Sequence, residues 1–124
     1  MPNRYVIDSH AWAEYLRGSP PGRRVKEIVE SGEVYTTSLT LAEVVSHVAN
    51  EKQDSALAAR AIQTISEIID VDSALAIAAA ERQGRGERKM TLRHALLIEA
   101  SKKVGAEIVS GDKKFASARA IMVK

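Results

Sequence analysis

The sequence has no cysteine, few aromatic residues and no long apolar run. Without cysteine the chain can form neither a disulfide nor a thiolate nucleophile. Aromatic residues make up only 4% of the chain, so aliphatic side chains must fill most of the core. No apolar stretch approaches the roughly 20 residues of a membrane-spanning helix, and the N-terminus does not resemble a secretory signal. We therefore expect a soluble, cytoplasmic protein that makes no membrane contact.

The chain does have the composition of a compact domain. Its 124 residues are 45% hydrophobic and 27% charged, values typical of globular rather than disordered proteins. This length is sufficient for one domain with a substantial core, and we predict a single domain over residues 1–124. The formal net charge is only +2, so the positions of the basic residues matter more than their sum.

Short β-branched runs alternate with segments of helical periodicity. The expected strands cover residues 5–7, 34–36, 68–71, 108–109 and 121–123. The segments between them have helical spacing, and residues 40–69 are expected to form a helical hairpin that turns near residues 52–54. This alternation predicts an α/β fold, in which helices cover both faces of a parallel sheet.

Asp8 ends the first β-branched run, directly before a helical pattern. Ligands of open α/β folds bind beyond the carboxyl ends of the parallel strands, which is where this carboxylate is expected. An Asp before a helix is also an ordinary N-cap, whose side chain accepts hydrogen bonds from the first helical N–H groups. Taken alone, Asp8 favours the cap.

Glu43 and Asp112 also follow predicted strands. Each has an ordinary explanation, because Thr40 to Glu43 fits a capping box and Gly111 with Asp112 is a common turn pair. The three strands should nevertheless end at one edge of the sheet. Clustered carboxylates repel one another unless a cation neutralises them or one of them takes up a proton, and oxygen ligands suit Mg²⁺ or Mn²⁺. Such ions support the hydrolysis of phosphodiester bonds.

Three segments carry a resemblance to a known family. They are YVIDSHAW at 5–12, TSLTLAEV at 37–44, and LRHALLIEA followed by IVSGDKKF within 92–115. In this order they resemble the PIN-domain ribonucleases, most of all the VapC-type toxins of VapBC toxin–antitoxin pairs. The resemblance implies a PIN-like three-layer α/β/α sandwich with a short, mostly parallel central sheet of roughly four to five strands and about six to seven helices.

The resemblance also implies roles for individual residues. Asp8, Glu43 and Asp112 match the catalytic carboxylates that bind the metal ion, which would be Mg²⁺ or Mn²⁺. Ser110 and Ser9 would support these carboxylates, Ser110 by hydrogen bonding.

His94 departs from the family pattern, because members typically carry an acidic residue at this position. A neutral imidazole could bind manganese or another transition ion, and a protonated one could contact phosphate, so His94 is a candidate catalytic residue. Alternatively, it has no role and one carboxylate is simply lost. Glu99 lies about 140° around the helix from His94 and does not replace that carboxylate. His10 and His47 are expected to be structural or surface residues outside the crevice.

Basic residues cluster just before His94 and directly after Asp112, and they are candidates for binding the RNA backbone. They are Arg93, Lys113, Arg88 and Lys89. Such charges bind phosphates without reading the base sequence, although a solvated surface would have the same composition.

The sequence therefore predicts a metal-dependent endoribonuclease that hydrolyses RNA phosphodiester bonds. If it is a toxin, the resemblance implies a homodimer and a protein antitoxin that lays an apolar helix into the active groove. The alternative is a catalytically weakened PIN-like domain, with His94 in place of an acidic ligand, that binds RNA or a protein. A phosphoryl-accepting α/β domain would share an Asp at a strand end, but the chain begins without a Gly-rich phosphate loop.

Overall fold

The computed structural model describes residues 2–85, 90–111 and 120–123. Within these segments the chain forms six helices and five strands. In chain order they are β1 (Asn3–Ile7), α1 (Ser9–Arg17), α2 (Pro20–Glu30), β2 (Gly32–Thr37), α3 (Ser38–Asn50), α4 (Ser55–Ile65), β3 (Glu67–Ile69), α5 (Ser73–Gly84), α6 (Leu92–Val104), β4 (Glu107–Ser110) and β5 (Ala120–Met122).

The strands form one sheet in the order β3-β2-β1-β4-β5, and every neighbouring pair is parallel. The predicted α/β class and parallel sheet are therefore confirmed. The shortest strands, β3 and β5, lie at the two edges, while β1 lies in the centre. The chain leaves β1 toward β2 on one side and later returns to β4 on the other side. This reversal is the position at which open α/β sheets bind their ligands.

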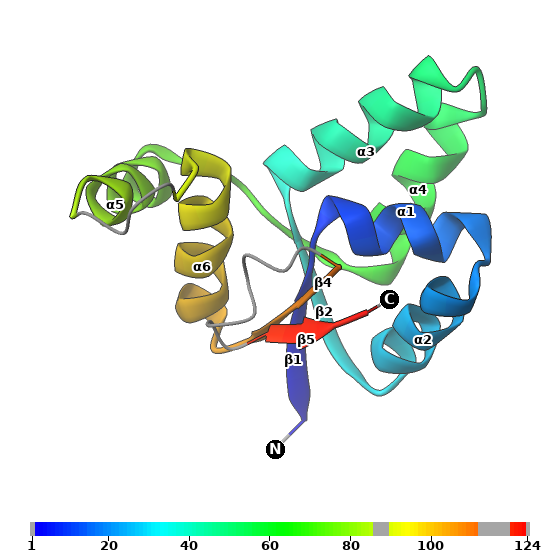
Figure 1. The fold of residues 1–124 in the computed structure, drawn as a ribbon, viewed down its shortest axis with the longest axis horizontal. Coiled ribbons are helices and arrows are strands. Elements are labelled where there is room, and N and C mark those ends of the chain that lie inside the picture. The colour runs from blue at the N-terminus through cyan, green and yellow to red at the C-terminus, as the bar shows by residue number, and fades with distance from the viewer. Residues whose placement is uncertain (1, 86–89, 112–119, 124) are drawn as a thin grey trace.

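Helices cover both faces of this sheet (Figure 1). Side chains alternate along β1, so Tyr5 and Ile7 pack into one core while Val6 packs into the other. The first core is completed by buried residues of α1 to α4, among them Trp12. The second is completed by α5 and α6, through residues such as Leu97. This arrangement is the three-layer α/β/α sandwich that the resemblance implies.

The helical hairpin of α3 and α4 is also confirmed, with one difference at its end. The apolar pattern continues through Ile69, but α4 ends at Ile65 and Ile69 belongs to β3. The break falls at Ser66, whose backbone is extended and whose hydroxyl donates to the Ile62 carbonyl oxygen at 2.7 Å. In the described segments no helix is long and apolar enough to cross a membrane.

Candidate active site

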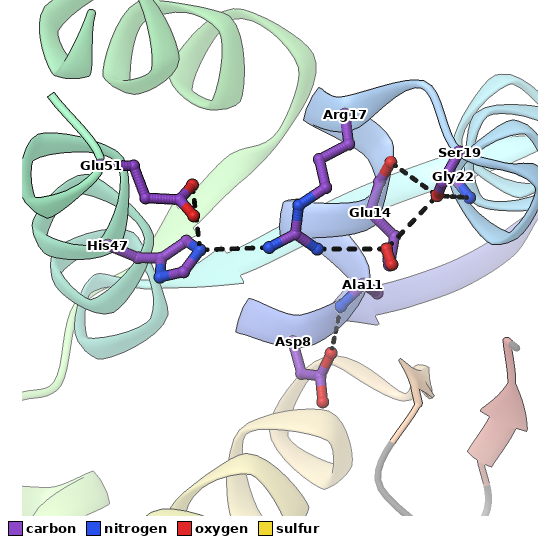
Figure 2. Close-up of polar contacts among 8 residues, drawn as sticks. All are labelled: Asp8, Ala11, Glu14, Arg17, Ser19, Gly22, His47 and Glu51. Atoms are coloured by element: carbon purple, nitrogen blue, oxygen red, sulfur yellow. Dashed lines mark hydrogen bonds and ion pairs between the residues drawn. The ribbon is translucent and has the colours of Figure 1, made fainter. Parts of the chain in front are cut away.

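Asp8 lies directly after the central strand and is fully buried. Its Oδ1 accepts a hydrogen bond from the Ala11 backbone N–H at 2.8 Å, which caps α1 (Figure 2). Its Oδ2 accepts a hydrogen bond from the Ser110 hydroxyl. The register explains the second contact, because Ile7 pairs with Val109 and the following residues are therefore neighbours. Asp8 is thus both an N-cap and a buried carboxylate at the strand end, so the two interpretations do not exclude each other.

Burial raises the pKa of the Asp8 carboxyl above its ordinary value of 3.8. The hydrogen bonds from Ser110 and Ala11 act in the opposite direction, as do the positive charges of Arg93 and His10. Removing a carboxylate from water is expensive, and buried groups with shifted pKa values concentrate at functional sites. The burial and the raised pKa of Asp8 are thus compatible with a functional carboxylate as well as with a cap.

Glu43 is not part of a capping box, so that interpretation is wrong. Helix α3 begins earlier than the pattern suggests, with Thr37 as its N-cap accepting from the Thr40 N–H at 3.0 Å. Glu43 therefore lies in the second turn, where it has no backbone N–H to cap. Its Oε2 pairs with Arg93 Nε at 2.8 Å. Its Oε1 is buried and has no hydrogen-bond partner among the described residues.

Arg93, at the beginning of α6, joins this carboxylate to the start of α1. Besides the ion pair with Glu43, its Nη2 donates to the Ser9 hydroxyl at 2.9 Å. Ser9, which was predicted to support the site, is the acceptor of this hydrogen bond. The guanidinium also contributes positive charge beside Asp8. The structure thus gathers Asp8, Ser9, Glu43 and Arg93 at one edge of the sheet, together with Ser110.

His94 is buried, with 7% of its surface exposed. Its backbone N–H donates to the Thr91 hydroxyl at 3.1 Å, which makes Thr91 the N-cap of α6. Burial places the imidazole in the protein interior, directly next in sequence to the arginine that binds Glu43. Glu99, farther along α6, pairs with Arg82 of α5 and does not replace the missing acidic residue.

His10 and His47 are exposed, as expected of surface residues, but they are not remote from Glu43. Both line a pocket of about 260 Å³ that also includes Ser9 and Glu43. The His10 ring packs so closely on Gly111 that an added Cβ would lie 2.2 Å from it. The sequence spacing could have placed His47 near Glu43, because His47 lies four residues after Glu43 and hence on the same face of α3. The contact of His10 with the turn after β4 has no such signal.

A chain of polar contacts joins α1 to α3 along this pocket (Figure 2). Arg17 Nη1 pairs with Glu14 at 3.2 Å, and Arg17 Nη2 lies 3.3 Å from His47 Nε2. His47 Nε2 in turn lies 3.4 Å from Glu51 Oε1. These contacts link the end of α1 to α3, and because most of these side chains are about half exposed they stabilise the arrangement only weakly.

Four of the predicted site residues lie outside the described segments. They are Asp112, Lys113, Arg88 and Lys89. In the part of the chain that the structure describes, no group of three His, Cys, Asp or Glu side chains is arranged to hold a metal ion. Of the three predicted metal-binding carboxylates, the described residues include Asp8 and Glu43.

The family model of the PIN domain matches residues 5–121. The chain belongs to the PIN domain family. No curated protein sequence matches. The resemblance seen in the motifs is thus confirmed at the level of the family.

Several solved structures share the fold. VapC20 of Mycobacterium tuberculosis, described as a toxin that cleaves the sarcin–ricin loop, is 22% identical, with a TM-score of 0.75 over 97% of this chain and 98% of VapC20. A chain of a toxin–antitoxin complex from Klebsiella pneumoniae is 18% identical, with a TM-score of 0.74 over 92% of each chain. A chain of VapBC2 from Rickettsia felis, solved with a promoter DNA fragment, is 16% identical, with a TM-score of 0.73 over 96% of each chain. At these identities the comparison establishes the PIN-like fold.

Proposed function

We propose that this PIN-domain protein is a metal-dependent endoribonuclease that hydrolyses RNA phosphodiester bonds, and that it is the toxin of a toxin–antitoxin pair. The observation that carries the proposal is the buried Asp8 carboxylate at the end of the central strand, with Glu43 at the same edge of the sheet. The relation to VapC20, a toxin described as cleaving RNA of the sarcin–ricin loop, supports the same reaction.

Asp8, Glu43 and Asp112 would hold Mg²⁺ or Mn²⁺. The donor set fits such an ion, because carboxylate oxygens are the ligands that hard divalent cations prefer. Glu43 Oε1 is buried without a hydrogen-bond partner in the described segments, so one oxygen remains available for a cation. When bound, the ion lowers the pKa of a water molecule and stabilises negative charge on the leaving oxygen.

The protein's own side chains position these carboxylates and the RNA. The Ser110 hydroxyl and the Ala11 N–H fix the two oxygens of Asp8, so its orientation does not depend on the ion. Arg93 links Glu43 to the start of α1, because it pairs with the Glu43 carboxylate and donates to the Ser9 hydroxyl. The remaining basic candidates, Arg88, Lys89 and Lys113, together with Arg93, are proposed to bind the phosphate backbone.

The partners follow from the proposed toxin role. We expect a protein antitoxin, a homodimer and a cytoplasmic location. The solved relatives include a toxin–antitoxin complex and VapBC2 bound to promoter DNA, which supports an antitoxin partner.

The residue at position 94 favours a second candidate function. His94 replaces the acidic residue expected there, and this would weaken binding of a hard cation. The protein would then be a PIN-like module that binds RNA or a protein and cleaves little or nothing.

An RNA-cleavage assay in different metals distinguishes the enzyme from the binding module. Purified protein and the His94→Asp variant are incubated with mixed RNA in Mg²⁺, in Mn²⁺ or in chelator. We expect the wild type to cleave in Mn²⁺ or Mg²⁺ and not in chelator, and His94→Asp to gain activity in Mg²⁺ by about tenfold because a carboxylate suits Mg²⁺ better than an imidazole. Absence of cleavage by the wild type in every metal would favour the binding module.

A further inference from the structure

Arg93 places a permanent positive charge on one of the carboxylates proposed to hold the cation. Its Nε lies 2.8 Å from Glu43 Oε2, and each side chain is 31% exposed. A partly buried ion pair is screened less by solvent than a surface pair and is correspondingly stronger. Arg93 is therefore an electrostatic component of the site.

The ion pair with Arg93 uses only one of the two carboxylate oxygens of Glu43. An arginine that fully satisfied the carboxylate would bind both oxygens side by side. Arg93 instead divides its donors, with Nε on Glu43 and Nη2 on the Ser9 hydroxyl at 2.9 Å. Glu43 Oε1 remains buried with no hydrogen-bond partner within the described residues.

A divalent cation bound at Oε1 would bring a second positive charge onto the carboxylate that already carries the guanidinium. Like charges at such a separation repel one another, and the effect is larger in a half-buried site than in water. Arg93 and the cation therefore compete for Glu43, although Arg93 retains Ser9 as a partner on α1.

We propose that Arg93 is an internal counter-ion of Glu43, and that its charge lowers the affinity of the site for a divalent cation bound at the other carboxylate oxygen. The inference rests on the proposed function, because it concerns the same carboxylates. In the absence of the cation, Arg93 neutralises Glu43 near the Asp8 carboxylate and stabilises the fold. In the presence of the cation, it opposes binding.

Arg93 is thus expected to stabilise the fold and to weaken cation binding. Thermal unfolding in chelator measures the first effect, and calorimetric titration with Mn²⁺ measures the second. We expect Arg93→Gln to lower the Kd for Mn²⁺ by about tenfold, since the competing charge is removed. In chelator the same variant is expected to have a lower Tm than the wild type, because Glu43 loses its partner. Arg93→Lys keeps the charge and should stay close to the wild type in both measurements.

Arg82 provides a matched control. It makes a comparable half-buried ion pair, with Glu99 on α6, and it does not line the pocket that contains Glu43. Arg82→Gln should lower the Tm while leaving the Kd for Mn²⁺ unchanged. In a Glu43→Gln background, Arg93→Gln should change the Kd by a smaller factor, since the competition for the Glu43 carboxylate is gone and only the repulsion between the two cations remains.

An unchanged or weaker Mn²⁺ affinity in Arg93→Gln would overturn the inference, as would an equal gain in Arg82→Gln. If the wild type still binds Mn²⁺ and loses this binding in Asp8→Asn, the proposed function survives that failure. If neither the wild type nor any variant with Asp8 intact binds Mn²⁺, the inference and the metal-dependent function both fail.

Discussion

Asp8 is a residue at which stability and the proposed activity make opposite demands. Its side chain caps α1, which favours folding, but the carboxylate is buried at a cost. The sequence alone favoured the cap, and the family motifs favoured the metal ligand. In the structure, Asp8 Oδ1 caps the helix and Oδ2 accepts a hydrogen bond from Ser110. The sequence could predict the position of this carboxylate at the end of a strand, but it could not predict that the carboxylate is fully buried.

We expect Asp8→Asn to be more stable than the wild type at neutral pH, by about 1 kcal/mol, because asparagine caps a helix equally well and carries no charge into the interior. Burial raises the pKa of Asp8 in the folded protein, so ionisation favours the unfolded chain. The contribution of Asp8 to stability is then fully present below its unfolded pKa and is lost as pH rises through its folded pKa.

Urea unfolding in chelator between about pH 3.5 and pH 8 measures this difference. The advantage of Asp8→Asn should shrink as pH falls toward the ordinary aspartate pKa of 3.8. A variant that is less stable than the wild type at pH 7, or an advantage independent of pH, would contradict the assignment of burial as the dominant cause.

At the scale of single elements, the start of α3 determines where Glu43 points. The sequence pattern favours Thr40 as the cap, whereas the structure has Thr37 as the N-cap, which leaves Glu43 beyond the first turn. The capping-box pattern from Thr40 to Glu43 hides this earlier start, since Thr37 is followed by Ser38 and not by an apolar residue. The packing of α1 against α3 was equally hidden, and with it the placement of His10 and His47 beside Glu43.

Loss of the α3 cap should reduce activity as well as stability. Thr37→Ala removes the acceptor for the Thr40 N–H and should cost about 1 kcal/mol. Asp54→Ala removes the corresponding cap of α4, where Oδ1 accepts from the Leu57 N–H at 2.9 Å, and should cost about the same.

Only Thr37→Ala is expected to slow RNA cleavage, by about tenfold or more, because small displacements of a catalytic group are costly. Unfolding curves and initial cleavage rates, taken at a temperature where both variants are folded, check this. Equal cleavage rates for the two variants would show that the start of α3 does not position Glu43.

At the scale of the whole molecule, the strand order places the site. Because β1 is central and β2 and β4 flank it, the residues after these three strands lie together at the carboxyl edge. The sequence predicted this edge from the alternation of β-branched runs and helical segments, since parallel strands end on the same side. It could not supply the inter-strand register, which brings Ser110 to Asp8, or the distance from Glu43 to Arg93, which depends on how α3 and α6 pack.

The central claim is that the carboxylate of Asp8 is required for metal-dependent cleavage of RNA, and not for folding. Its most direct test is the initial rate at which the wild type and Asp8→Asn cleave RNA in Mn²⁺, with a chelator control and with the Tm of each protein measured in the same buffer. We predict that Asp8→Asn is folded and cleaves at least about 100-fold more slowly, since one carboxylate ligand is lost from the metal site. Cleavage by folded Asp8→Asn at the wild-type rate, or cleavage that persists in chelator, would contradict the account.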